Sequence, residues 1–462
     1  MLTMMNLIDT LNGTLTYLLI IFLPAVALWF TIRSRGAQFR MIPEMIRELG
    51  RSGNRSGKGE GVSSFQAFTI SIASRVGTGN LAGVATAIAL GGPGAIFWMW
   101  IIALLGGANA FIESTLAQLF KSPGKGSFIG GPAYYIQKGL GAKWFAALFA
   151  TLLIFTFGFA FNSVQSNTIA SAYQTAFGIN PLYYGIAITT FTLFIIFGGI
   201  QRIAKFSQSV VPVMAIIYLL MAIVVIILRI DRISEVFKLI ISNAFGWEQA
   251  IGGGIGAAIE MGVKRGLFSN EAGMGSAPNV AATADVSHPV KQGLIQSLSV
   301  YTDTLIICSC TAFIILCSGL YNSGHDGIAL TQLSLNQEVG SWGSYFIAVI
   351  ILFFAFTSII GNYYYGESNV LFLTKNRTAM QLFRTLVGVV VMLGSIAELR
   401  VVWSFADITM SLMTICNLIA IVLLGRYAII CLKDYQRQRS EGLDPVYRSS
   451  TIPEIADKTE CW

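Results

Sequence analysis

Long apolar runs alternate with short polar connections along almost the whole chain. Eleven of these runs are long enough to cross a lipid bilayer as helices, which takes about 20 mostly apolar residues. They occupy residues 15–32, 65–90, 94–120, 144–173, 181–200, 206–228, 248–283, 290–318, 342–373, 379–397 and 401–425. The pattern therefore predicts an all-α polytopic membrane protein with 11 transmembrane helices and its termini on opposite sides of the membrane.

Two of the apolar runs are interrupted by glycine and polar residues. The first interruption reads SRVGTGNLAG (residues 74–83), and the second reads GGGIGAAIEMGVKRGLFSNEAGMGSAP (residues 252–278). An unpaired backbone group in hydrocarbon costs several kcal/mol, so helices unwind at membrane depth only where protein, water or a ligand supplies partners. The alternative is that these glycines only permit close helix packing. We expect the first interruption to be an unwound binding segment.

The spans after the first one form two sets of five, and each set begins with an interrupted run. Because five is odd, the second set must have the opposite orientation. This predicts an extra N-terminal helix (1–33) followed by a five-plus-five inverted repeat (65–229 and 230–425). Residues 34–64 are predicted to be a cytoplasmic amphipathic and linker segment. Residues 426–462 are predicted to be a cytoplasmic tail, which is polar and expected to be mobile from Lys433 on. Paired interrupted helices in inverted repeats point to a substrate site near the membrane midplane.

Charge and composition fit this topology. Apolar residues make up 54% of the chain and charged residues 11%, with a mean hydropathy of +0.67 and a net charge of +7. The basic residues are scattered between spans, which argues against nucleic-acid binding. Four basic residues lie on one predicted side of the membrane: Arg229, Arg232, Lys238 and Arg400. Arg75 lies within a span, and the other basic residues lie on the opposite side, which is therefore assigned to the cytoplasm. This orientation places the N-terminus outside.

The sequence shows no cleavable signal, which suits the inner membrane of a prokaryote, and a monomer in the bilayer is consistent with it. Six cysteines lie mostly in apolar runs and only two histidines are present, so neither a metal centre nor a disulfide framework is indicated. No nucleophile has an evident nearby base, so an enzyme is not expected. A passive facilitator would need a continuous polar stripe, which is not evident.

Five sequence blocks resemble the alanine or glycine:cation symporter family, which has the leucine-transporter fold. The blocks are SRVGTGNLAGVATAI (74–88), GGPGAIFWMW (91–100), KRGLFSNEAGMGSAP (264–278), FTSIIGNYYYGE (356–367) and NLIAIVLLG (417–425). The resemblance implies a secondary active transporter that imports a small neutral amino acid, alanine or glycine, together with sodium by alternating access.

An amino-acid zwitterion brings two charges into low dielectric, and both need partners there. A half-helix N-terminus at the first interruption would direct free N–H groups at the carboxylate. The residues expected to contact substrate there are Gly77, Thr78, Gly79 and Asn80. In the fourth span Asn162 and Gln165 share a face. Interhelical hydrogen bonding is the alternative for both, and the resemblance favours substrate contact.

The resemblance also implies a sodium site. Thr357 and Ser358 are similar to a hydroxyl pair that completes such a site in this fold, and the other ligands would be carbonyls around Ala73, Val76 and Gly77. The alternative is that both hydroxyls bond to their own helix. Ser358, with Ile359 and Asn362 on the following turn, is also expected to face the substrate.

Asn362 departs from the family pattern, in which a tryptophan is usual at this position. An amide there would make the pocket larger and more polar. The alternative function is therefore sodium- or proton-coupled uptake of a larger or more polar amino acid such as glutamine or serine.

Charged residues within spans are costly and usually paired or functional. Arg75 lies about 15 Å into its helix at 1.5 Å per residue, too deep to reach the surface. It is interpreted as a structural pin or gate beside the first interruption, and a clamp for the substrate carboxylate is the alternative. The candidates for this ion pair or gate are Arg75, Glu271, Asp303 and Glu367, and Asp303 or Asp407 is an alternative carrier of a coupling proton.

Overall fold

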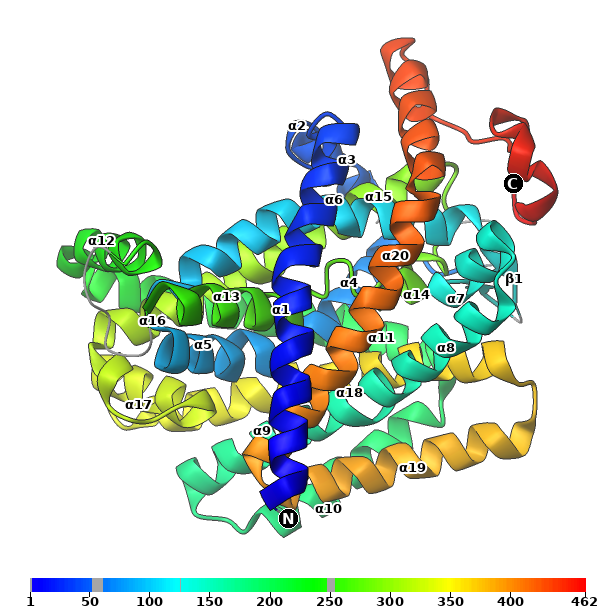
Figure 1. The fold of residues 1–462 in the computed structure, drawn as a ribbon. Helices are drawn as coiled ribbons and strands as arrows, with labels where there is room; N and C mark the ends of the chain where they lie inside the picture. The colour runs from blue at the N-terminus through cyan, green and yellow to red at the C-terminus, as the bar shows by residue number, and fades with distance from the viewer. Residues whose placement is uncertain (1, 52–60, 125, 247–253) are drawn as a thin grey trace.

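The structure is a computed structural model that describes residues 2–51, 61–124, 126–246 and 254–462. It is mostly helical (Figure 1). Within the described residues, eight helices are long and apolar enough to cross a membrane: Thr10–Arg33, Ala95–Leu119, Lys143–Phe177, Lys205–Leu228, Pro289–Ser318, Trp342–Leu373, Arg377–Ile396 and Leu399–Ser440. Two shorter apolar helices are Gly79–Gly91 and Pro181–Ile196. The protein is therefore a multi-pass membrane protein.

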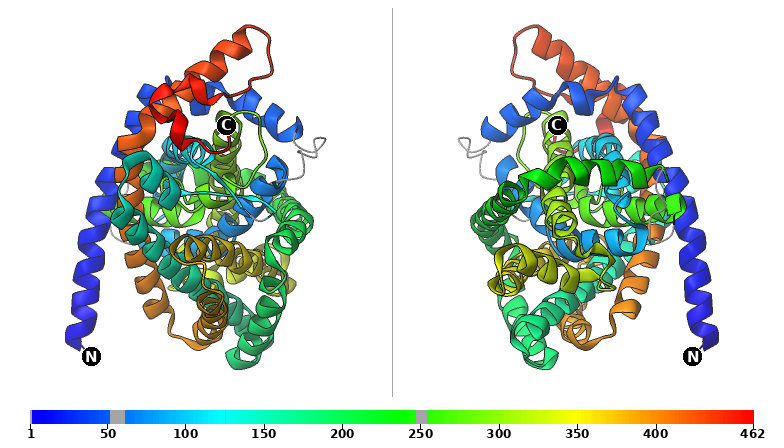
Figure 2. Two further views of the ribbon diagram at one scale, coloured as in Figure 1. Left: turned by 90° about the vertical axis from the view of Figure 1, so that its right-hand side faces the viewer. Right: turned by 90° about the vertical axis from the view of Figure 1, so that its left-hand side faces the viewer.

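Helix α1 (Leu2–Arg33) stands at the edge of the molecule, beside α20 (Leu399–Ser440), as Figures 1 and 2 show. The two helices approach closely at Gly425, where an added Cβ would lie 2.6 Å from the Phe30 ring. Beyond α1, the short α2 (Ala37–Arg40) and the amphipathic α3 (Ile42–Arg51) lie across the same end of the molecule.

Both interrupted runs are broken helices. The first consists of α4 (Ser64–Arg75), a bend, a π-helical turn over Gly79–Gly83 and α5 (Val84–Gly91). The second consists of α13 (Gly254–Asn270), an irregular stretch over 271–277 and the short α14 (Pro278–Ala281). The structure therefore has breaks where the sequence predicts them.

The remaining elements surround these two broken helices. They are α6 (Ala95–Leu119), the β1 (Ser122–Pro123) and β2 (Phe128–Ile129) hairpin, α7 (Pro132–Tyr135), α8 (Lys143–Leu153), α9 (Phe161–Phe177), α10 (Pro181–Ile196), α11 (Gly199–Leu228), α12 (Ile233–Ala244), α15 (Pro289–Tyr301), α16 (Ser309–Ser318), α17 (Gly327–Val339), α18 (Trp342–Leu373) and α19 (Arg377–Ile396). The π-helical segments Ile154–Ala160 and Thr302–Cys308 join α8 to α9 and α15 to α16.

Local sequence explains several helix ends. Ser63 caps α4 in a capping box: Gln66 N donates to Ser63 Oγ (3.1 Å), and Ser63 N donates to the Gln66 side chain (3.0 Å). Asn180 caps α10 directly before Pro181, which suits the first helical position because it lacks an N–H. Gly178 ends α9 in the left-handed conformation that glycine adopts readily.

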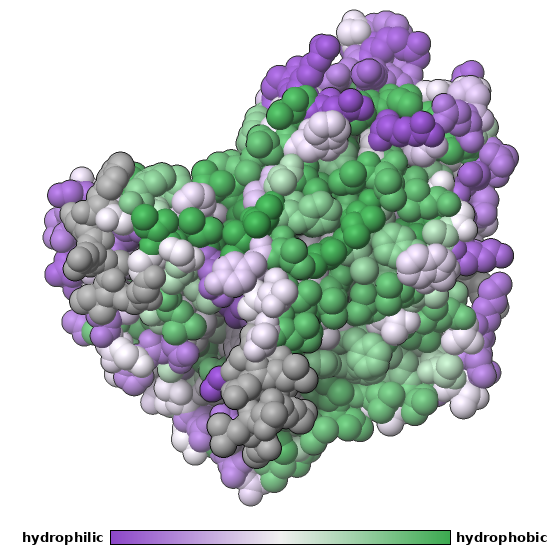
Figure 3. All heavy atoms as spheres, viewed as in Figure 1, coloured by the Kyte–Doolittle hydropathy of each residue, from purple (hydrophilic) through white to green (hydrophobic). Residues whose placement is uncertain are grey.

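The polarity of the interior and the surface suits a lipid environment. Figure 3 shows an apolar surface over the middle of the molecule and hydrophilic groups gathered near the end that carries α3 and the C-terminal residues. Large apolar side chains such as Phe191, Phe194 and Leu220 are exposed on α10 and α11. Polar side chains are buried in the centre, around the two breaks. Buried polar groups in a membrane protein mark functional or paired positions.

The C-terminal region differs from the sequence expectation of a mobile polar tail from Lys433 to Trp462. Helix α20 continues to Ser440, and the following chain returns to the protein body, where Tyr447, Ile452 and Ile455 are buried. Polar composition pointed to mobility, but a few apolar side chains are sufficient to fix this segment.

Candidate functional site

The first break is closed by hydrogen bonds between its own residues. After α4 ends, Val76 adopts an extended conformation (φ −77°, ψ 91°). Gly77 N donates to the Asn80 side-chain oxygen (2.9 Å), and Asn80 N donates to Gly77 O (3.3 Å). A Cβ at Gly77 would lie 2.7 Å from Gln165 Oε1, so this close approach requires glycine.

Gln165 on α9 joins the first break. Its Oε1 accepts hydrogen bonds from Thr78 N (2.9 Å) and Thr78 Oγ1 (2.8 Å). Gly79, the next residue, packs against Ser269 and Phe268 of the second broken helix. The predicted substrate-contact residues of the break therefore lie together with Gln165, and all of them are buried.

The other predicted substrate residues are placed differently. Asn162 Nδ2 donates to Gly158 O in its own helical segment (3.1 Å), and its Oδ1 has no partner among the described residues. Asn167, which was not among the predicted substrate residues, donates to Gly394 O (2.9 Å) and Ala397 O (2.8 Å), so it joins α9 to the end of α19. Ile359 is buried in the apolar core.

The two adjacent hydroxyls of α18 have different surroundings. Ser358 Oγ lies 2.9 Å from Ala73 O and 3.3 Å from Val76 O, the carbonyls at the end of α4, and 3.0 Å from Phe354 O. Thr357 Oγ1 donates to Phe354 O in its own helix (2.9 Å). Hydroxyl and carbonyl oxygens are ligands that suit a hard cation. Ser358 and two predicted carbonyl ligands thus converge, whereas Thr357 shows the contact expected of a hydroxyl bonded to its own helix.

The second break begins at Glu271, whose φ of +55° is unusual for a residue other than glycine. Its carboxylate accepts hydrogen bonds from Ser74 Oγ (2.9 Å) and Ser276 Oγ (2.5 Å). Ser74 Oγ also lies 2.7 Å from Asn362 Oδ1, and Asn362 Nδ2 has no partner among the described residues. Asn362 therefore belongs to a polar chain that joins α18, α4 and the second break.

Glu113 on α6 holds the rest of the second break. Its carboxylate accepts from Gly273 N (3.2 Å), Gly275 N (3.1 Å) and Asn417 Nδ2 (2.8 Å). Both glycines have φ of +86°, and the N–H groups of these two alternate residues point at one anion. Sequence reasoning did not assign this role. The signal for it was a glutamate within a span that carries few charges.

Asp303 lies where the two breaks meet. It accepts from Asn80 Nδ2 (2.7 Å), Ser269 Oγ (2.7 Å) and Thr304 Oγ1 (3.0 Å). The side chain is fully buried. It therefore bridges α13, the first break and the α15–α16 span through neutral donors.

Arg75 and Glu367, both candidates for an ion pair or gate, have different contacts in the structure. Arg75 Nη1 donates to Ser299 Oγ, whereas its Nε and Nη2 have no partner among the described residues and no described carboxylate lies within 4.0 Å. Glu367 instead pairs with Arg384 of α19 (2.8 Å). Sequence gives no distances between spans, and so it did not identify these partners.

A further ion pair lies on α13 and α20. Asp407 accepts two hydrogen bonds from Arg265 (2.8 and 3.2 Å), and Lys264 Nζ lies 3.4 Å from it. The sequence-based count assigned these two basic residues to the cytoplasmic side, but they lie within α13. The Arg265 guanidinium also lies over the Trp403 ring, 4.1 Å from its centroid.

Aromatic rings connect this pair to the first break. The ring centroids of Trp403 and Phe268 are 4.7 Å apart, and those of Phe268 and Phe161 are 4.4 Å apart. Phe268 also packs on Gly79. One side of the candidate site is therefore covered by tilted aromatic rings, and the outermost of them, Trp403, contacts the buried Arg265–Asp407 ion pair.

Comparison with known proteins adds a family and a fold. The model of the sodium:alanine symporter family matches residues 1–449. The "Probable sodium/glutamine symporter GlnT" of Bacillus subtilis (strain 168) is 52% identical over 446 residues, which cover 96% of this chain and 93% of the relative. The "Amino-acid carrier protein AlsT" of the same organism is also 52% identical, over 95% of this chain and 93% of the relative.

Among solved structures, MhsT in complex with L-phenylalanine has a similar fold. The TM-score is 0.57 at 13% sequence identity, and the match covers 87% of this chain and 93% of that chain. At this identity the likeness concerns the arrangement of helices and not the ligand.

Proposed function

Because this chain belongs to the sodium:alanine symporter family, we propose that it is a secondary active transporter that imports a neutral amino acid together with sodium by alternating access. The observation that carries the proposal is the first break, where backbone N–H groups and carbonyls are free of helical pairing at the centre of the molecule. These are the groups that an amino-acid carboxylate and a sodium ion need in low dielectric.

We infer the following layout in the membrane. The protein has 11 transmembrane helices: an extra N-terminal helix (1–33) and an inverted repeat of 65–229 and 230–425. The N-terminus lies outside, and residues 34–64 and 426–462 are cytoplasmic. The distribution of basic residues between spans supports this orientation, and it suits a monomer in the inner membrane of a prokaryote.

The substrate carboxylate binds the N–H groups of the first break. Gln165 Oε1 accepts from Thr78 N and Oγ1, as a carboxylate oxygen would. Substrate binding then means that the carboxylate takes these donors and the Gln165 amide turns to contact the ligand. Gly77, Gly79 and Asn80 shape this site through the backbone, and Asn162, Ile359 and Ser358 lie on the neighbouring spans.

Sodium binds between α4 and α18. The proposed ligands are the carbonyls of Ala73, Val76 and Gly77 and the hydroxyls of Thr357 and Ser358. The short distances from Ser358 Oγ to Ala73 O and Val76 O support this set, and Thr357 would have to leave its present bond to Phe354 O. An ion here would hold the inner half of the first broken helix against α18, which orders the adjacent substrate site and couples the two ligands.

Alanine or glycine is the first candidate substrate, and glutamine or serine is the second. The second is favoured by Asn362, whose Nδ2 is buried and has no partner among the described residues. A donor of this kind suits a polar substrate side chain. The 52% identical relative named as a sodium/glutamine symporter supports the same alternative.

The test is uptake of labelled L-alanine and L-glutamine into proteoliposomes with an inward sodium gradient, compared with an equal potassium gradient. Sodium-dependent accumulation is expected. An interior-negative potential should increase it, because one positive charge moving inward gains about 2.3 kcal/mol per 100 mV, roughly fifty-fold in accumulation. Equal uptake in both salts without accumulation would favour a passive facilitator and contradict the proposal.

A further inference from the structure

A short backbone pairing joins the ends of the two broken helices on the side that carries α3. Val62, just before α4, forms a parallel bridge with Ala284, just after α14. Val62 N donates to Thr283 O (3.2 Å), and Asp285 N donates to Val62 O (3.1 Å). We call this pairing of 62 with 283–285 the latch. The latch ties the chain just before α4 to the chain just after α14.

The C-terminal end of α6 supports the latch from behind. Gln118 Nε2 donates to Ala281 O (2.5 Å) and Ala284 O (2.9 Å). Lys121 Nζ donates to Ala284 O as well (3.2 Å) and is almost fully buried. The position of 281–284 thus depends on where Gln118 and Lys121 are held.

Residues 443–462, which we call the strap, contact this same end of α6. Trp462 Nε1 donates to Gln118 O (2.9 Å), and Lys121 Nζ lies 4.7 Å from the centroid of the Trp462 ring. Glu460 forms an ion pair with Lys138 (3.0 Å). Residues 460–462 lie beyond the range matched by the family model, so these contacts do not follow from the family pattern.

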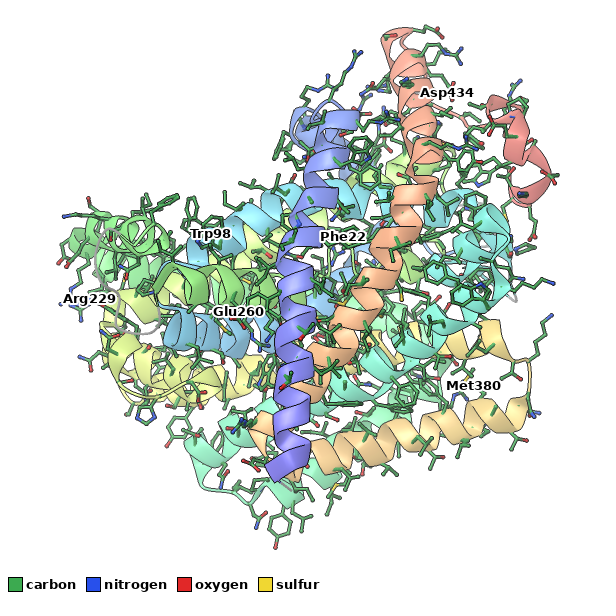
Figure 4. The ribbon with its side chains drawn as sticks, viewed as in Figure 1. Phe22, Trp98, Arg229, Glu260, Met380 and Asp434 are labelled. Carbon is green, nitrogen blue, oxygen red and sulfur yellow. The ribbon has the colours of Figure 1, made fainter. Side chains whose placement is uncertain are left out.

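The other end of the strap holds the chain directly after the latch. Tyr447 N donates to Ser287 O, and Ser287 Oγ donates to Pro445 O, both at 2.9 Å. Asp444 pairs with Lys291 at the start of α15 (2.7 Å). Figure 4 marks Asp434 near the far end of α20, from which the strap returns to the body, as Figure 2 also shows. The strap therefore contacts the elements on two sides of the latch.

We propose that the strap is an intrachain lock that holds the cytoplasmic latch closed and sets how readily the protein opens inward. The proposal rests on the function above, in which the inner halves of the broken helices separate to release substrate. Opening the latch moves 281–288, and this movement must break the contacts of the strap with Ser287 or displace Gln118 and Lys121, which Trp462 contacts. Release of the strap and inward opening are thus linked equilibria.

The test is hydrogen–deuterium exchange of the full chain in lipid nanodiscs, read at the Val62 and Asp285 amides. Trp462→Ala removes an indole hydrogen bond and a cation–π contact, so exchange at both amides should rise about tenfold. Trp462→Phe keeps a ring and should give a smaller increase. The matched control is Glu454→Gln. Glu454 lies in the strap and forms an exposed ion pair with Arg426 of α20, so this variant breaks a contact of the strap that does not involve the latch.

A charge exchange provides an independent measurement. Lys138→Glu should raise exchange at the latch, and Lys138→Glu with Glu460→Lys should restore the wild-type value. Faster exchange confined to 443–462, with Val62 and Asp285 unchanged in every variant, would overturn the lock. Sodium-driven uptake is recorded in parallel. Unchanged exchange at Val62 and Asp285 in every variant, with normal uptake, contradicts only this inference, whereas absence of uptake in the wild type contradicts the proposed function.

Discussion

At the scale of single residues, the neighbouring hydroxyls Thr357 and Ser358 differ in what they touch. Both hydroxyls contact Phe354 O of their own helix, and Ser358 Oγ in addition contacts the carbonyls of Ala73 and Val76 at the end of α4. Ser358→Ala should therefore raise the sodium concentration for half-maximal uptake by about tenfold or more, since one oxygen ligand is lost from a small set.

This prediction is checked by sodium titration of uptake at saturating amino acid. Thr357→Val keeps the shape of the side chain and should have the smaller effect. The opposite order, with Thr357 dominant, would show that the sodium-bound state rearranges the α18 hydroxyls.

Asn362 is predicted to set preference between polar and apolar substrates. Asn362→Leu keeps the branched shape of the side chain and removes both the unpartnered Nδ2 donor and the Oδ1 that contacts Ser74. If glutamine or serine is bound through this amide, its kcat/KM should fall at least about tenfold relative to that of alanine. The readout is the ratio of uptake efficiencies of two substrates in one preparation, which cancels differences in protein yield. An unchanged ratio would exclude Asn362 from side-chain recognition.

Some residue roles were accessible from sequence and others were not. The break at Gly77 to Asn80 could be predicted because polar groups and glycines are exceptional within an apolar span, and substrate contact there stays a prediction. Arg75 was recognisable as a buried cation, but its contact with Ser299, and the pairing of Glu367 with Arg384, depend on distances between spans. A single sequence contains no information on those distances.

At the scale of elements, the second break is shaped by an anion from another helix. Glu113→Gln should destabilise this break because an amide has one acceptor oxygen where the carboxylate has two, and its NH2 group would face a backbone N–H. The expected loss is about 1–3 kcal/mol of stability, with a lower thermal unfolding midpoint and reduced uptake.

Glu113→Asp is the companion variant, since it retains the charge and shortens the reach. Equal stability of the wild type and Glu113→Gln would mean that the Gly273 and Gly275 N–H groups do not depend on the charge of residue 113.

The two broken helices and most helix positions could be predicted from the pattern of apolar and polar residues. Polar groups within an apolar run of membrane length have few stable arrangements. The helical extension of α20 to Ser440 and the return of the chain to Ser287 did not follow. They depend on a few buried side chains, such as Tyr447, within a segment of polar average composition.

At the scale of the whole molecule, His288 connects α15, α20 and the strap. Its Nδ1 accepts from Val290 N (3.2 Å), its Nε2 faces Asp434 (3.4 Å), and the Tyr435 and Tyr447 rings pack around it. Burial lowers the pKa of His288 from 6.5 to about 4. Between these values the unfolded segment binds a proton that the folded one does not, so stability should fall as pH decreases from 6.5 to 4 and level off below.

The measurement is the thermal unfolding midpoint between pH 7.5 and 4 for the wild type and His288→Asn, in which asparagine can still cap α15. The difference in unfolding midpoint between the wild type and His288→Asn should change in favour of the variant as the pH falls from 6.5 to 4. Parallel curves would show that His288 does not contribute to the pH dependence of stability.

The pairing of Thr78 with Gln165 bears on the unloaded protein. In a carrier whose binding groups lack partners when empty, closing without substrate leaves these groups buried and unpaired, which is unfavourable. Such a carrier can only exchange one solute for another. Here an amide of the chain itself satisfies the vacant N–H. The empty protein can therefore close and return to its outward-facing state at little cost in free energy. The Gln165 side chain thus favours net uptake over obligatory exchange.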